Sequence, residues 1–333
     1  MQPMTSAPDK PNPRRRWWQF SLRALFVVLT VACVWLAWTV HRANEQRKAV
    51  EWVREMGGDV YYDYQYDEDD TILDDAEPPG PKWLVQLLGA DYFQEVFVVL
   101  LVGDTPVSDL TSLARLTSLE RLYLSGRQVS DLTPLAGLKN LETLSLAATP
   151  VSDLTPLAKL TSLQVLDLNS MPVNDLTPLE KLTSLEWLAL SNTAVTDLTP
   201  LAKLSSLQVL YLDSTPVNDL TPLATLTSLQ ELNLAATQVS DLTPLEKLTS
   251  LQELDLNNTP VNDLTPLEKL TSLEWLLLNN TPVTDLTPLA KLTSLQVLSL
   301  AATQVSEEQV EALRQALPNC DIGWPSANGS LVQ

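Results

Sequence analysis

The sequence repeats itself every 22 residues over most of its length. A valine recurs at this spacing from Val107 to Val305, and a run of leucines follows each one. In the interval that opens at Val151, leucines occupy positions 154, 157, 160, 163, 166 and 168. One such unit buries too little apolar area to offset the entropy lost on ordering its backbone, so neighbouring units must stack to form a stable structure.

Every unit contains Leu-x-x-Leu-x-Leu, and a fixed period with this pattern is typical of a leucine-rich-repeat solenoid. We predict an α/β solenoid, a right-handed curved array with a parallel β-sheet on its concave face and short helical turns on its convex face. In the recurrent Asp-Leu-Thr-Pro-Leu, Asp131 and Asp153 can cap open N–H groups of these turns, and Pro134 and Pro156 lie where a missing N–H costs little. Capping accounts for each aspartate without a metal ion.

The array needs a cap at each end. An N-terminal cap is predicted at 81–106, with a covering helix in "PKWLVQLLGADYF" and a degenerate first strand in which Leu100 and Val102 point inward. The nine repeats then occupy 107–304.

The C-terminal cap is predicted at 305–322. There "SEEQVEALRQAL" replaces the turn by a helix that Ser306 caps. "LPNCDI" then imitates the strand, with Cys320 and Ile322 as the inward pair, so Cys320 is interpreted as a core residue and not as a nucleophile. Residues 323–333 are predicted to form a flexible tail.

The N-terminal part has the composition of a membrane anchor. No charged residue lies between Ala24 and Val40, and tryptophans stand toward both ends of this stretch, where indole rings favour the membrane interface. We predict a transmembrane helix over 22–40, after a basic cytoplasmic tail at 1–21. The alternatives are a cleaved signal peptide, which the long apolar run without a closing cleavage site disfavours, and lipidation at Cys33.

Charge is divided unevenly along the chain. Residues 1–54 carry 9 Lys or Arg and 3 Asp or Glu, whereas the remainder carries 12 and 38. So acidic a domain is repelled by phosphate backbones and shows no basic stripe, which disfavours nucleic acid as a partner. The block Arg14 to Arg16 and the acidity of the rest favour a cytoplasmic N terminus and an extracytoplasmic repeat domain. Cys33 and Cys320 cannot pair across a membrane, so the apolar core must hold the fold.

Residues 41–80 are predicted to contain a juxtamembrane helix that stops at Gly57-Gly58, one strand and an acidic loop. The strand is indicated by the alternation of Val60, Tyr62, Tyr64 and Tyr66. The carboxylates of the loop at 63–77 suggest calcium, but Glu68 stands where an EF-hand has its glycine and the terminal glutamate is missing. We interpret the loop as solvated charge.

The run "VSDLTPLAKLTSLQVLDLNS" closely resembles the 22-residue repeats of internalin-type bacterial leucine-rich-repeat proteins, and the similarity extends over roughly 97–322. Residues 14–66 look like the membrane-anchor and strand module that precedes such repeats in some bacterial envelope proteins. The resemblance implies a solenoid that binds a protein on its concave sheet. The sequence departs from the family at Thr149, Thr193 and Thr215, where a ladder asparagine is usual, and it has no wall-sorting motif, so host-cell adhesion does not carry over.

Residues between the strand leucines line the sheet face, because strand side chains alternate. The sequence varies most at these positions, and exposed aromatic side chains beside charges are usual in binding hot spots. Drift between copied repeats is the alternative. The predicted partner-binding residues are Val165, Asp167, Trp187, Ala189, Val209, Tyr211, Asp213, Glu231, Glu253, Asp255, Trp275 and Leu277.

Catalysis has few candidates. The repeats contain no histidine, which excludes Ser-His-Asp and Cys-His sites and histidine-ligated zinc. Glu231 and Glu253 are predicted one strand apart, near the spacing of a retaining glycosidase, but an open sheet does not give an acid and a base separate environments. We predict no enzyme activity, cofactor or metal.

These features together predict a single-pass membrane protein whose acidic solenoid recognises a protein or peptide of some basic character. A structural spacer or scaffold element of the cell envelope is the first alternative. A cytosol-facing adaptor is the second, and the apolar stretch at 22–40 argues against it.

Overall fold

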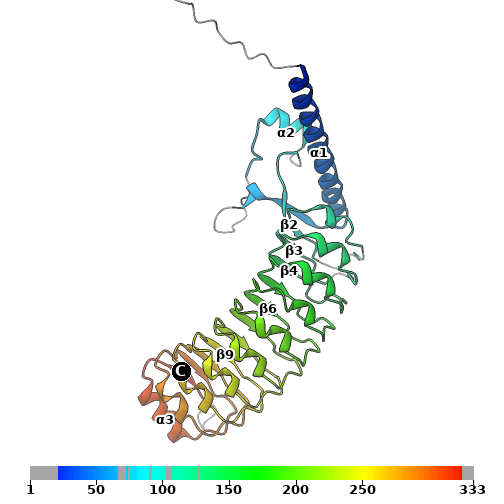
Figure 1. Cartoon of the computed structure of the whole chain (residues 1–333). Helices are drawn as coiled ribbons and strands as arrows, with labels where there is room; N and C mark the ends of the chain where they lie inside the picture. The colour runs from blue at the N-terminus through cyan, green and yellow to red at the C-terminus, as the bar shows by residue number, and fades with distance from the viewer. Residues whose placement is uncertain are drawn as a thin grey trace, which may run out of the picture. The chain divides into compact units, whose positions relative to one another are not determined.

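The computed structural model describes residues 22–66, 73, 76–89, 92–102, 107, 109–126 and 128–324 (Figure 1). The chain divides into two compact units, Met1–Asn44 and Glu45–Gln333. Helix α1, Leu22–Glu55, runs through the boundary without interruption. Its N-terminal part is long and apolar enough to cross a membrane, and the side chains of Phe26, Val31 and Trp35 are exposed.

The second unit is built on one sheet of 12 strands that follow one another in chain order. The first pair is antiparallel, and all later pairs are parallel. The strands are β1 Asp59–Tyr62, β2 Val96–Leu100, β3 Arg121–Tyr123, β4 Thr143–Ser145, β5 Val165–Asp167, β6 Trp187–Ala189, β7 Val209–Tyr211, β8 Glu231–Asn233, β9 Glu253–Asp255, β10 Trp275–Leu277, β11 Val297–Ser299 and β12 Asp321–Gly323.

Short 3-10 turns return the chain from one strand to the next, along the opposite side of the array from the strands (Figure 1). They are η3 Leu113–Arg115, η4 Thr133–Gly137, η5 Thr155–Lys159, η6 Thr177–Leu179, η7 Thr199–Lys203, η8 Thr221–Thr225, η9 Thr243–Lys247, η10 Thr265–Lys269 and η11 Thr287–Lys291. The predicted leucine-rich-repeat solenoid is confirmed.

The core consists of the repeated leucines stacked on their counterparts. Leu166, Leu188 and Leu210 pair in register across β5, β6 and β7, and all three are fully buried. Because the strand residues on either side of each leucine point the opposite way, constant positions lie inside and variable positions lie on the sheet face.

The capping prediction is confirmed in every turn. Asp153 accepts a hydrogen bond from the N–H of Thr155 at 2.8 Å, and the same bond recurs at the equivalent aspartates. These hydrogen bonds hold the pKa of each aspartate below its usual range. The acceptors are Asp109, Asp131, Asp153, Asp175, Asp197, Asp219, Asp241, Asp263 and Asp285.

The buried threonine hydroxyls form their hydrogen bonds within their own repeat. Thr215 donates its hydroxyl to the Leu212 carbonyl three residues earlier, at 2.6 Å, and Thr193 makes the same bond to Leu190. Thr149 is the exception, because its buried hydroxyl has no hydrogen-bond partner among the described residues. At these positions, where the resemblance predicts a ladder asparagine, the threonine hydroxyls of Thr193 and Thr215 therefore bond locally.

The N-terminal end differs from prediction in three respects. First, the strand ends at Tyr62, and Tyr64 lies in the 3-10 turn η1, Asp63–Gln65, so the alternation up to Tyr66 does not mark one strand. A side-chain oxygen of Gln65 accepts the N–H of Tyr62 at 3.0 Å, which closes this turn.

Second, the register of the first parallel strand is one residue earlier than predicted. Val99 pairs with Leu122, and Val99 and Leu101 are fully buried, whereas Val102 is 58% exposed. A shift of one residue reverses the face of every side chain in a strand, so the prediction for Leu100 and Val102 was wrong.

Third, the predicted covering helix forms as α2, Lys82–Leu88, but does not cover the array. Its apolar side chains Trp83 and Leu87 are exposed. The C-terminal turns of α1 contribute to the core instead, through the buried side chains of Ala49, Val50 and Val53. An ion pair between Glu45 and Arg115 joins the same helix to η3.

The C-terminal helix α3, Glu307–Ala316, begins as predicted, with the Ser306 hydroxyl accepting the N–H of Gln309. The final strand is offset, because Ile322 takes the place of the first strand leucine opposite Leu298. Ile322 is buried, and both Cys320 and Trp324 are partly buried and pack against the core, so Cys320 contributes to the core as predicted while Trp324 follows Ile322 in the strand register. Gly323 and Trp324 therefore belong to the fold and not to a tail, and residues 325–333 lie outside the described residues.

Candidate functional site

The sheet face presents two parallel columns of side chains, one on each side of the strand leucines. In the first column Trp187 pairs with Val165 and Val209, and Trp275 pairs with Glu253 and Val297. In the second column Tyr211 pairs with Ala189 and Asn233, and Leu277 pairs with Asp255. The predicted residues thus lie together on one face in the predicted order.

An aromatic pair forms the centre of the first half of this face. The rings of Trp187 and Tyr211 meet edge to face, with their centroids 5.6 Å apart. Val165 and Val209 flank the indole in the first column. Ala189 is fully buried between its larger neighbours, so it cannot contact a partner and its assignment to the binding face was wrong.

Two of the predicted acidic residues are engaged in holding strands together. Asp167 accepts hydrogen bonds from the hydroxyl of Ser145 at 2.9 Å and from the N–H of Asn169 at 3.1 Å. Asp213 accepts a bond from the hydroxyl of Ser191 in the preceding repeat. These carboxylates therefore stabilise the array, a role that the sequence pattern did not indicate.

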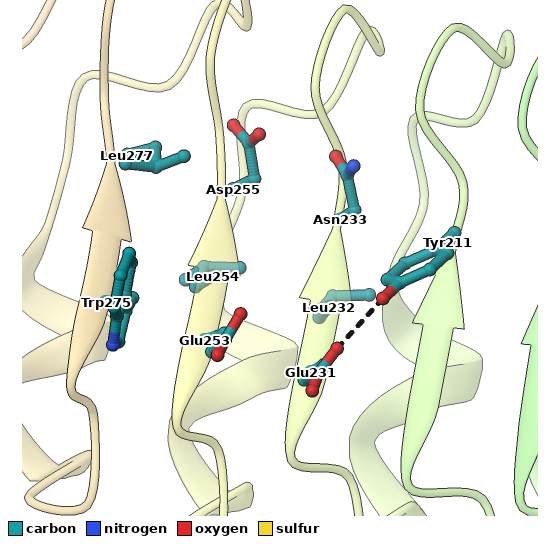
Figure 2. Close-up of a pocket in the computed structure, with 9 residues that line it drawn as sticks. All are labelled: Tyr211, Glu231, Leu232, Asn233, Glu253, Leu254, Asp255, Trp275 and Leu277. Carbon is teal, nitrogen blue, oxygen red and sulfur yellow. Dashed lines mark hydrogen bonds between the residues drawn. The ribbon is translucent and has the colours of Figure 1, made fainter.

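Beyond the aromatic pair the face is hollowed. A hollow of about 200 Å³ extends from Tyr211 to Trp275 and Leu277. Leu232 and Leu254 line it with Asn233, and Glu231, Glu253 and Asp255 bring three carboxylates to it (Figure 2). We call this site the acidic hollow. Sequence reasoning missed Asn233, although it occupies the same column as Tyr211 and Asp255.

Burial is the main cause of the pKa shifts in the acidic hollow. Partial burial, with the charges of Glu231 and Glu274 nearby, raises the pKa of Glu253. Burial likewise raises the pKa of Asp255, although the N–H of Asn257 at 2.8 Å opposes the shift. Tyr211 donates its hydroxyl to Glu231 at 2.9 Å, and burial together with this bond raises the pKa of Tyr211 to about 12.

This face brings aromatic rings and carboxylates side by side on an open sheet. In the described part of the chain, no group of three or more His, Cys, Asp or Glu side chains comes together in a way that could hold a metal ion. Glu231 and Glu253 lie on adjacent strands of an open sheet, where both are within reach of water. The Cys320 thiol is half-buried, and burial raises its pKa to about 11, which disfavours the reactive thiolate.

Comparisons with known proteins agree with the fold. The family model for leucine rich repeats (2 copies) matches residues 139–181, 183–225 and 227–269. An internalin of Listeria monocytogenes, InlF, is 28% identical, with a TM-score of 0.55, over 68% of this chain and 79% of that one.

Two further solved structures are similar. Internalin InlC2 of the same organism is 33% identical over 63% of this chain and 82% of its own, with a TM-score of 0.47. A leucine-rich-repeat protein of Leptospira interrogans is 25% identical over 65% of this chain and 57% of its own, with a TM-score of 0.61. No curated protein matches the sequence.

Proposed function

The chain belongs to the internalin-like leucine-rich-repeat proteins, and from that premise we propose that it is a membrane-anchored module that binds a protein or peptide on its sheet face, outside the cytoplasm. Repeat domains of the internalin kind bind proteins. For this chain we propose the residues that contact the partner and the side of the membrane on which they lie.

One observation carries the proposal, namely where the repeats differ. The buried positions keep valine and leucine from repeat to repeat, while the sheet face changes between aromatic, acidic and small side chains. Trp275 is 45% exposed on this face, and a partner that covered its ring would gain binding energy by removing this apolar surface from water. An array that served only as a spacer would gain nothing from such a side chain.

The apolar part of α1 supports the anchor. Its side chains are exposed along the stretch that is long enough to cross a membrane, as expected of a helix that faces lipid. The compact block Arg14 to Arg16 before this stretch and the long acidic chain after it support a cytoplasmic N terminus. A signal peptide that is removed would instead leave the repeats free outside the cytoplasm.

A capture experiment tests the proposed recognition. The full chain, purified in mild detergent, is incubated with envelope extract of the source cells beside the double variant Trp187→Ala/Tyr211→Ala. A matched control, Glu180→Ala/Lys203→Ala, removes an exposed ion pair on the turn side. We expect a species held by the native chain and by the control but lost by the sheet-face variant. Equal retention by all three would favour the envelope spacer.

Protease treatment of intact cells tests the topology. We expect an external protease to degrade the repeats while the N-terminal tail stays protected. Protection of the repeats until lysis would reverse the orientation and favour the cytosol-facing adaptor.

A further inference from the structure

The acidic hollow combines an exposed indole with unpaired negative charge. Trp275 and Glu253 pair in register on adjacent strands, which places their side chains about 5 Å apart at the Cβ atoms. Figure 2 shows the indole standing along its strand, beside the carboxylate of Glu253 and below Leu277. A flat group inserted here meets an aromatic ring on one side and a carboxylate on the other.

The three carboxylates of the hollow differ in the hydrogen bonds that they accept. Glu231 accepts the Tyr211 hydroxyl, and Asp255 accepts the N–H of Asn257. The side chain of Glu253 makes no hydrogen bond or ion pair with any other described residue. Glu253 is therefore the acceptor that the fold leaves open.

We propose that the acidic hollow receives the guanidinium group of one arginine side chain of the partner. The inference rests on the proposed function and names the partner side chain that the sheet face would bind. The guanidinium stacks on the indole of Trp275 and donates two hydrogen bonds to Glu253, while its remaining donors face Asp255.

Physical chemistry favours this occupant over others. Burial raises the pKa of Glu253, with a smaller contribution from the charges of Glu231 and Glu274, and a cation bound beside Glu253 would oppose both effects. A metal ion is disfavoured, because no group of three or more metal-ligating side chains converges among the described residues. The planar guanidinium matches both the ring face and the carboxylate fork, whereas a neutral or anionic side chain would leave the acidic groups unpaired.

Binding of a minimal probe tests the proposal without knowledge of the partner. The full chain in lipid nanodiscs, labelled with 5-fluorotryptophan, is titrated with N-acetyl-arginine-N-methylamide, and the Trp275 resonance is assigned from a Trp275→Phe variant. N-acetyl-citrulline-N-methylamide has nearly the same shape without the charge. We expect a saturable shift of the Trp275 signal with the arginine probe and binding at least about tenfold weaker with citrulline, the scale of one charge-assisted hydrogen bond.

Two matched variants test whether the carboxylate of Glu253 binds the arginine probe. Glu253→Gln should weaken the arginine probe by a similar factor, whereas Glu246→Gln, which removes the same charge from turn η9, should leave its affinity unchanged. Equal binding of the two probes, no movement of Trp275, or an equal effect of the two variants would overturn the proposal.

The probe titration and the capture experiment test the arginine site and the proposed function separately. If a captured partner depends on the sheet face but the probe does not bind, the arginine site fails and the recognition module stands. If the probe binds as expected and no partner is captured, the hollow is a cation site and the wider proposal fails.

Discussion

Tyr211 touches two neighbours on the sheet face, because its ring packs against Trp187 and its hydroxyl donates to Glu231 at 2.9 Å. The aromatic pair and the acidic hollow are therefore parts of one continuous surface. The indole of Trp187 on β6 lies two strands from Glu231 on β8, the first carboxylate of the hollow, so one partner could cover both.

Separating the two contacts of Tyr211 should separate their effects. Tyr211→Phe keeps the ring against Trp187 and removes the bond to Glu231, so we expect the free energy of unfolding to fall by about 1 kcal/mol. Tyr211→Ala loses both contacts and should cost more. Urea denaturation of the full chain in detergent measures both, and identical values for the two variants would show that the ring contact contributes nothing.

The threonine column offers a paired test of hydrogen bonding. Thr149→Val removes a buried hydroxyl that has no partner in the described part of the chain, so we expect stability to rise by about 1 kcal/mol. Thr215→Val removes a hydroxyl that is bonded to the Leu212 carbonyl, so stability should fall by about the same amount. Thermal denaturation of both variants under one condition gives the comparison, and changes of the same sign would contradict this account.

Each repeat also contains one residue in the left-handed backbone region. Ala236 has φ 57°, and its equivalents Ala148, Asn258 and Ala302 have similar values. Glycine accepts this conformation without a Cβ clash, so Ala236→Gly should raise stability by about 0.5–1 kcal/mol. Ala235→Gly, at a neighbouring position outside this region, should lower it, and hydrogen exchange of the repeat reports both changes. Loss of stability in Ala236→Gly would count against the assigned backbone.

The aspartate caps predict how stability depends on pH. Hydrogen bonds from Thr221 hold the pKa of Asp219 below its ordinary value, as happens in the other turns. A group whose pKa is lowered by folding stabilises the native state above its unfolded pKa, about 3.9 for aspartate, and that contribution is lost as the pH falls through the lowered value. We therefore expect the denaturation midpoint to drop progressively below about pH 4.

Variants of Asp219 show whether the cap is responsible. Asp219→Asn keeps an oxygen acceptor and should weaken the pH dependence while it retains much of the stability at pH 7. Asp219→Ala loses the acceptor and should lower the denaturation midpoint both at pH 7 and below about pH 4. An unchanged acid profile in Asp219→Asn would assign the acid sensitivity to other carboxylates.

The sequence predicted the repeats well because their period is redundant. Leu166, Leu188 and Leu210 each predict the others, so the strand register and the sheet-face columns followed from spacing alone. At Val99 and Ile322 no copy of the repeat fixes the register, and a shift of one or two residues leaves an equally apolar pattern. For that reason the predicted registers of these two strands differ from those in the structure.

The remaining differences depend on packing between distant segments. Trp83 and Leu87 have the pattern of a buried helix, yet the end of the array is packed by Ala49, Val50 and Val53 of α1, a choice that local periodicity does not encode. Ala189 was predicted to be exposed from its column, but its size lets its larger neighbours bury it. The hydrogen bonds of Asp167 and Asp213 likewise depend on serines 22 residues earlier in the chain.

Site-specific photocrosslinking tests the central claim most directly, because it asks which face meets another protein in intact cells. Benzoylphenylalanine is placed at Val209, on the sheet face beside Trp187, or at Lys203, in turn η7 of the same repeat. We predict a crosslinked product of higher mass from position 209 and none from position 203. Products from 203 alone, or equal products from both positions, would contradict recognition through the sheet face.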